Sequence, residues 1–174
     1  MKYITPFLFA GILLLTSCGT GKERKDSTRI GADTVATSAE VLDNKGQLTA
    51  RMVMSPVIRS QDSLRLHFMV YNPSTSSQRF CKWHTPFEPP MSKYLDIKDE
   101  QGTEAEYHGI MAKRVMPPPP DSFLELKSRD SLSVTVDISK IYILGKSGRY
   151  TVRYNAEGIS GLSVKDSISF VYEK

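Results

Sequence analysis

Short stretches in which apolar and polar residues alternate fill the chain from residue 48 onward, and this period of two limits the fold more than any other feature. Successive side chains of a β-strand point to opposite faces of the sheet, so the alternation predicts strands with one buried face. The clearest stretches are residues 64–71, 131–136, 150–154 and 168–172. Weaker candidates are residues 48–54, 78–83, 94–98 and 122–126.

Clusters of Asn, Pro, Gly, Ser and Asp, the residues that favour turns, separate these stretches. No segment shows the 3.6-residue period of a long amphipathic helix, although residues 137–142 predict a single helical turn that bridges the two sheets. About seven to eight short strands joined by turns within residues 48–174 indicate an all-β fold. We predict an antiparallel immunoglobulin-like β-sandwich.

The first 17 residues break this pattern and predict a lipoprotein signal peptide. Lys2 precedes an apolar run of about nine residues, which is too short for a membrane span of about 20. Residues 15–19 read Leu-Thr-Ser-Cys-Gly and resemble the bacterial lipobox, in which the signal peptidase cuts on the N-terminal side of the cysteine and the cysteine thiol carries a diacylglycerol. We therefore predict a lipid on Cys18 that anchors the protein in the bacterial cell envelope, at the outer membrane or cell surface in a diderm. The alternative is an ordinary cleaved signal that happens to contain a cysteine.

Residues 18–47 predict a flexible lipidated tether, because they contain no aromatic residue and no sustained periodicity. A coil of this composition and length reaches about 30 Å. Lys22, Arg24 and Lys25 are a small basic cluster that suits anionic lipid headgroups, but Glu23 and Asp26 interrupt it, which favours a solvated linker.

Charge and motif content argue against nucleic-acid binding and against catalysis. The net charge of +4 is spread along the chain and forms no basic stripe. His67, His84 and His108 lack the spacing of a helical zinc site. Cys81 and His84 would face opposite sides of a strand, so we expect Cys81 to pack against Trp83 as a small hydrophobe. We expect no metal, no cofactor and no catalytic residue; a zinc site assembled across the fold and a reactive Cys81 are the open alternatives.

A proline-rich cluster at residues 83–90 suggests a first contact surface. Trp83 is the only tryptophan and is expected in the core between the sheets. Phe87 is bracketed by Pro86 and Pro89, in a loop that is not a regular strand. We therefore expect Phe87 to be exposed as an anchor for a partner.

A second cluster combines Lys113 and Arg114 with the four prolines at 117–120, which predict a stiff polyproline II loop. Methionine and arginine are enriched at interfaces, and a preorganised loop loses little entropy when it binds. The alternative is an edge strand with solvated charges. The candidate partner-binding residues are therefore Phe87, Lys113, Arg114, Pro117 and Pro118.

The two clusters and the strands around them resemble a known family. Residues 71–73 and 80–88, which read Tyr-Asn-Pro and Phe-Cys-Lys-Trp-His-Thr-Pro-Phe-Glu, are similar to a segment of the N-terminal domain of deuterolysin-type (aspzincin) metalloendopeptidases. Residues 107–123 and 130–154 resemble later parts of that domain. The resemblance covers about residues 48–174.

In that family the immunoglobulin-like domain is a propeptide that assists folding of the zinc protease and holds it inactive. The His-Glu-x-x-His motif is missing here, and the chain ends where a catalytic domain would begin. The resemblance therefore implies a non-catalytic domain that binds a protein partner, with a metalloprotease inhibited or helped to fold in trans as the expected partner. Two alternatives are a cell-envelope module that binds glycan or protein, which an exposed platform of Tyr94, Tyr107 and Tyr142 would favour, and a protease-related protein of another function.

Overall fold

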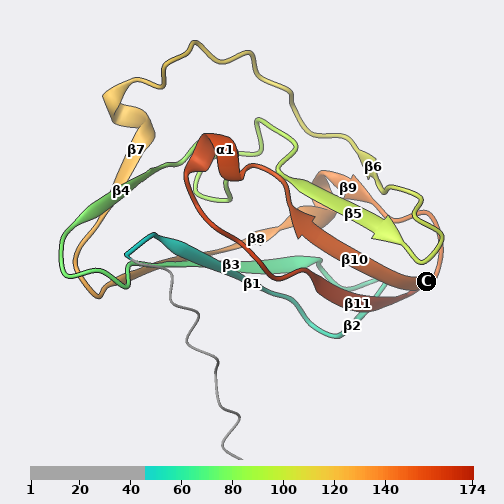
Figure 1. Ribbon diagram of the computed structural model, residues 1–174. Coiled ribbons are helices and arrows are strands. Elements are labelled where there is room, and N and C mark those ends of the chain that lie inside the picture. The colour runs from blue at the N-terminus through green and yellow to red at the C-terminus, as the bar shows by residue number, and fades with distance from the viewer. Residues whose placement is uncertain (1–45) are drawn as a thin grey trace, which may run out of the picture. The chain divides into compact units, whose positions relative to one another are not determined.

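The computed structural model describes residues 46–174, which form the β-rich domain drawn in Figure 1. The predicted signal peptide, the lipidation site Cys18 and residues 18–45 of the predicted tether lie outside the described residues. Among the residues that are described, no helix is long and apolar enough to cross a membrane.

The domain contains eleven strands and three short helical turns. The strands are β1 (Thr49–Val53), β2 (Val57–Arg59), β3 (Arg65–Tyr71), β4 (Gln78–Cys81), β5 (Leu95–Asp99), β6 (Glu106–Tyr107), β7 (Phe123–Leu126), β8 (Ser131–Asp137), β9 (Tyr142–Ile143), β10 (Gly148–Tyr154) and β11 (Ile168–Glu173). The turns are the 3-10 helices η1 (Pro120–Ser122) and η2 (Ile138–Lys140) and the single α-helical turn α1 (Glu157–Ser160).

Two main sheets make the sandwich, which confirms the predicted all-β fold class. One sheet has the order β1-β3-β8 and the other β2-β11-β10-β5, and every pairing is antiparallel except that of β2 with β11. Figure 1 shows β3 lying between β1 and β8. Two smaller ladders, β4-β7 and β6-β9, complete the domain. The immunoglobulin-like character of the sandwich stays a prediction.

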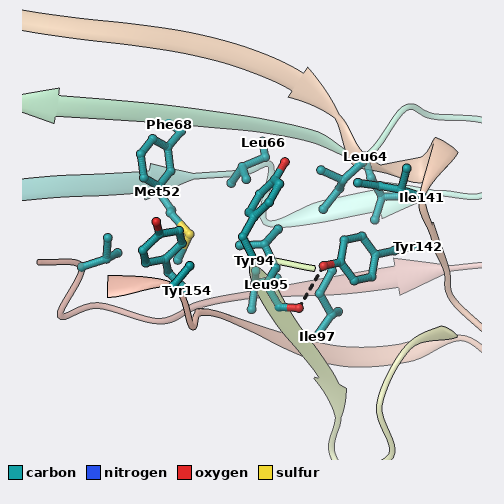
Figure 2. Close-up of a cluster of buried hydrophobic side chains, with 14 of the residues drawn as sticks. Met52, Leu64, Leu66, Phe68, Tyr94, Leu95, Ile97, Ile141, Tyr142 and Tyr154 are labelled. Carbon is teal, nitrogen blue, oxygen red and sulfur yellow. Dashed lines mark hydrogen bonds between the residues drawn. The ribbon is translucent and has the colours of Figure 1, made fainter. Parts of the chain in front are cut away.

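The core forms where the inward faces of the two sheets meet, as the alternation predicts. On β3, Leu66, Phe68 and Val70 are fully buried, while Arg65 and Tyr71 at its ends are exposed. Figure 2 shows Leu66 and Phe68 facing residues carried on and beside the opposite sheet, including Tyr94, Leu95 and Tyr154. The hydroxyl of Tyr142 donates a 2.9 Å hydrogen bond to the carbonyl of Leu95, so a buried polar group is satisfied inside the apolar cluster.

All eight predicted stretches contain strands, and two of their ends differ by two residues: β10 begins at Gly148, before the predicted residue 150, and β4 ends early. The predicted strand 78–83 stops at Cys81, because the chain then enters a tight turn in which Thr85 Oγ1 donates to the carbonyl of Lys82 at 2.6 Å. The strands β2, β6 and β9 were not predicted, since two or three residues are too few for a period of two to be visible.

The predicted helical turn at 137–142 is present as η2, where the carboxylate of Asp137 accepts a hydrogen bond from the backbone N–H of Ser139. It leads from β8 to β9, which belongs to the small β6-β9 ladder and not to the second main sheet. The predicted polyproline II run is shortened: Pro119 is extended, with φ −67° and ψ 160°, but Pro120 is the first residue of η1.

Candidate functional site

The structure joins the two proline-rich clusters, which lie far apart in the sequence. A long segment, residues 108–119, runs from β6 to η1 without forming a strand, and we call it the strap (Figure 1). Arg114 in the strap pairs with Glu88 of the first cluster, with Nη2 and Oε2 2.5 Å apart. The guanidinium carbon of Arg114 also lies 4.7 Å from the centre of the Trp83 ring. A charged pair and a cation–π contact therefore fasten the strap to the turn beneath it.

The turn that receives Arg114 is itself tightly built. Thr85 is fully buried, and its hydroxyl accepts a hydrogen bond from the backbone N–H of Phe87 at 3.2 Å. Glu88 Oε1 accepts from the backbone N–H of His84 at 2.8 Å, and the carbonyl of His84 accepts from the hydroxyl of Tyr154 at 3.0 Å. Both carboxylate oxygens of Glu88 are thus used, one to close the turn and the other to hold the strap.

Two further contacts fix the first half of the strap. The hydroxyl of Tyr107 donates to the carbonyl of Ile110 at 3.0 Å, and the backbone N–H of Ala112 donates to the carbonyl of Met91 at 2.9 Å. Gly109 lies directly against the Tyr107 ring, so that a Cβ atom there would overlap the ring and its hydroxyl. The absence of a side chain at Gly109 is therefore what permits this approach.

Beside these contacts the strap presents apolar side chains to solvent. Ile110, Met111, Val115 and Met116 are between 63% and 82% exposed. Lys113 lies among them and is exposed. These five exposed residues, four apolar and one cationic, lie within residues 110–116 of a segment that is fixed at several points, and we call them the strap patch. Clustered exposed apolar residues of this kind mark interaction sites in soluble proteins.

Not every predicted contact residue is placed as expected. Lys113 and Pro117 are exposed, and Pro118 is half-buried. Arg114 is not a free surface cation, because its side chain is only 19% exposed and is committed to Glu88 and Trp83. Phe87 is half-buried instead of fully exposed.

Phe87 fails as an exposed anchor because the core offers it aromatic partners. Its ring lies edge-on to Phe80, at 5.5 Å between ring centres, and to Phe68, at 6.1 Å. Edge-to-face contacts at these distances are favourable beyond the area that they bury. Pro86 and Pro89 thus set the path of a turn that folds inward instead of displaying its aromatic residue.

Sequence reasoning missed Glu88 as a site residue, although it is the hub of the cluster. A lone carboxylate in a proline-rich turn gives no periodic signal, and its partner lies 26 residues along the chain. The one available cue was the cation pair Lys113–Arg114 in a second loop, but the sequence does not show which loops meet. Gly109 was likewise visible only as a glycine, with no sign of the ring against it.

The remaining candidates for chemistry are Cys81 and the three histidines. Cys81 is 1% exposed, and burial raises the pKa of its thiol, which disfavours the reactive thiolate. Burial also lowers the pKa of His84, whose ring is half-buried. His67 lies 3.1 Å from the Thr135 hydroxyl, and His108 lies 2.9 Å from a Glu106 carboxylate oxygen. Within residues 46–174 no three His, Cys, Asp or Glu side chains gather as metal ligands would.

The three tyrosines considered for a glycan platform are not displayed together. Tyr94 and Tyr142 are each 2% exposed, and the half-buried Tyr107 packs against Tyr142 with ring centres 5.2 Å apart. These residues therefore form no flat exposed aromatic surface.

Comparison with known proteins gives a limited similarity. No family model matches the chain. An extracellular protease of Aeromonas hydrophila is 30% identical over 107 residues, which are 62% of this chain and 30% of that protein. The chain is thus similar, over part of its length, to a protease. Because the match spans less than a third of the protease, it indicates a protease relationship and leaves the activity of this chain open.

Proposed function

We propose that this protein is a lipid-anchored, non-catalytic binding module of the bacterial cell envelope that inhibits a metalloprotease or assists its folding in trans. The similarity to an extracellular protease and the resemblance to an aspzincin propeptide suggest the kind of partner. A lipid on Cys18 and a tether of about 30 residues, with a reach of about 30 Å, would hold the domain near the membrane while leaving it free to turn.

The observation that carries the proposal is the strap patch. Its exposed methionines, isoleucine and valine are suited to enter an apolar pocket, and Lys113 is suited to meet an acidic group beside that pocket. The Arg114–Glu88 pair and the Trp83 contact fix the strap before a partner arrives. Binding then loses less conformational entropy than it would with a free loop.

The glycan-binding alternative has less support. A flat surface of exposed aromatic rings would favour glycan binding, and Tyr94, Tyr107 and Tyr142 do not supply such a surface. The strap patch instead combines apolar residues with one cation, which is the composition of a protein contact.

The experiment measures inhibition of purified deuterolysin-type metalloproteases from the same organism by the purified protein. We expect inhibition that weakens about tenfold or more in the variants Lys113→Glu and Val115→Asp, since a central interface residue contributes about 2 kcal/mol or more. Refolding of the denatured protease, with and without the protein, tests the folding-helper role.

Matched substitutions elsewhere on the domain separate a local effect from a general one. Lys98→Glu on β5 reverses the charge of another exposed lysine, and Val53→Asp on β1 places a charge at a half-exposed valine. Both controls should inhibit like the unmodified protein. Neither inhibition nor binding at micromolar excess, or equal loss in strap and control variants, would contradict the proposal.

A further inference from the structure

Three of the four outer edges of the main sheets are protected. Beside β1, Ser163 exchanges backbone hydrogen bonds with Leu48 and Ala50. Beside β5, residues 103–105 return along the strand and bond back to it. β2 is only three residues long and follows Pro56. Short edges, prolines and covering loops are the ordinary devices that prevent one sheet from pairing with another.

β8 is the fourth edge, and it lacks such protection. It is seven residues long and pairs with β3 along its whole length, while no backbone hydrogen bond from residues 46–174 reaches its other side. Its sequence, Ser-Leu-Ser-Val-Thr-Val-Asp, has no proline and no charge before the final residue. Valine and threonine favour strands, so this edge is well suited to accept a further strand.

The inward side chains of β8 show where the sandwich is open. Leu132, Val134 and Val136 are only half-buried, although they lie opposite the fully buried Val70, Phe68 and Leu66 of β3. A strand added beside β8 would cover this apolar row in addition to satisfying the free backbone groups. Both gains act in the same place.

The occupant that fits best is a second copy of β8. When two copies lie antiparallel about a two-fold axis at Val134, Leu132 faces Val136 of the other copy on the inner side of the sheet. On the outer side, Ser133 faces Thr135 in the same way. Apolar residues thus meet apolar residues, and hydroxyls meet hydroxyls, which are favourable cross-strand pairs.

The ends of the strand are also compatible with this register. Ser131 faces Asp137, so neither end brings two like charges together. We propose that the β8 edge is a homodimer interface, in which two copies of the protein pair through residues 131–137 and form one continuous six-stranded sheet. A two-fold interface of this kind uses the same surface on both subunits.

Sedimentation equilibrium on the predicted mature chain, residues 18–174, carrying Cys18→Ala tests the proposal, because this form has neither the apolar signal segment nor the lipid, either of which would itself cause association. We expect a monomer–dimer equilibrium between about 1 and 100 µM, the range for a small interface. The variant Ser133→Lys/Thr135→Lys places lysines opposite each other twice in the dimer and should raise the dissociation constant about tenfold, at up to about 1 kcal/mol per pair.

The matched control is Ser133→Lys/Thr135→Glu, which alters the same exposed positions but places opposite charges across the axis. It should dimerise at least as well as the unmodified chain, and unchanged thermal unfolding in both variants shows that each still folds. A monomer throughout the range overturns the proposal, and equal weakening by both variants overturns the register. Because the strap patch is untouched, loss of dimerisation with full protease binding separates this proposal from the proposed function.

Discussion

The sheet framework and the strap are held in place by different kinds of contact. In the framework, neighbouring strands share ladders of backbone hydrogen bonds, and each strand adds a row of apolar side chains to one common core. In the strap, a few side-chain contacts do the same work, chiefly the pair between Arg114 and Glu88 and the packing of Arg114 on Trp83. Stability in the first region is distributed, and in the second it is concentrated.

The contrast explains why exposed apolar residues occur where they do. The strap is held by the Arg114–Glu88 pair, which we call the latch. It therefore does not need its own apolar side chains for stability, and Ile110, Met111, Val115 and Met116 are free to face solvent. A strand of the framework has no such freedom, because its apolar residues are what hold it. Binding surfaces are commonly found on loop segments like the strap, carried on a rigid scaffold like the sheet framework.

The largest loss of stability is expected from Phe68→Ala, which removes a core side chain of the framework. Phe68 is fully buried and its ring contacts those of Phe87 and Tyr154, so truncation should cost about 3–5 kcal/mol of unfolding free energy. Urea unfolding measures the loss. Val53→Ala, at a half-exposed position, should change stability by less than about 1 kcal/mol. Similar losses in both variants would show that the core is not the common support described here.

A smaller and local effect is expected from opening the latch with Arg114→Ala. The Glu88 carboxylate, which is 5% exposed, then loses its cation, and the free energy of unfolding should fall by about 2–3 kcal/mol. This loss is somewhat below that of a fully buried pair, because Arg114 retains some exposure. Trypsin should cleave after Lys113 much faster than in the unmodified protein, since the strap is released while the sheets persist. Mass spectrometry of the first fragments identifies the cleaved bond.

The double variant Glu88→Leu/Arg114→Met provides the control for the latch. Replacing both charged partners with apolar residues removes the unpaired charge and leaves only the backbone N–H of His84 without its acceptor, so the stability of the double variant should lie closer to that of the unmodified protein than the stability of Arg114→Ala does. If the single variant unfolds globally, or if its strap resists trypsin, the strap and framework are not separately held.

The framework was largely predictable from the sequence, because its contacts leave a local trace. The alternation in residues 64–71 places Leu66, Phe68 and Val70 on one face whatever strand lies beside them, and the structure buries all three. The strands β6 and β9 were not predicted, because a two-residue strand has no period to detect.

The arrangement of the strap was not predictable, because its determinants are pairs distant in sequence. Phe87 between prolines and Arg114 beside Lys113 both have the local features of an exposed contact residue. Their partial burial follows from where the chain brings Phe68, Phe80 and Glu88, which no local pattern reveals. Lys113, in contrast, is exposed, as lysines mostly are.

The smallest effect on stability is expected at Asp137, which is the last residue of β8 and caps the 3-10 helix η2. Its carboxylate accepts hydrogen bonds from the hydroxyl and backbone N–H of Ser139, and these bonds, the hydroxyl first, hold the pKa of Asp137 below its ordinary value. A carboxyl whose pKa is lower in the folded than in the unfolded chain stabilises the fold above its ordinary pKa. That contribution is lost as the pH falls through the folded pKa.

Asp137→Ala should therefore lower the free energy of unfolding by about 1 kcal/mol at pH 7, as the loss of a helical cap does. The difference between the variant and the unmodified protein should shrink steadily below about pH 4. Urea unfolding of both proteins from pH 7 to pH 2.5 measures it. Ser139→Ala removes the hydroxyl donor but keeps the carboxylate, so its pH dependence should lie between the two. A deficit in Asp137→Ala that persists undiminished at pH 2.5 would mean that packing at the end of β8, and not the ionised cap, stabilises this junction.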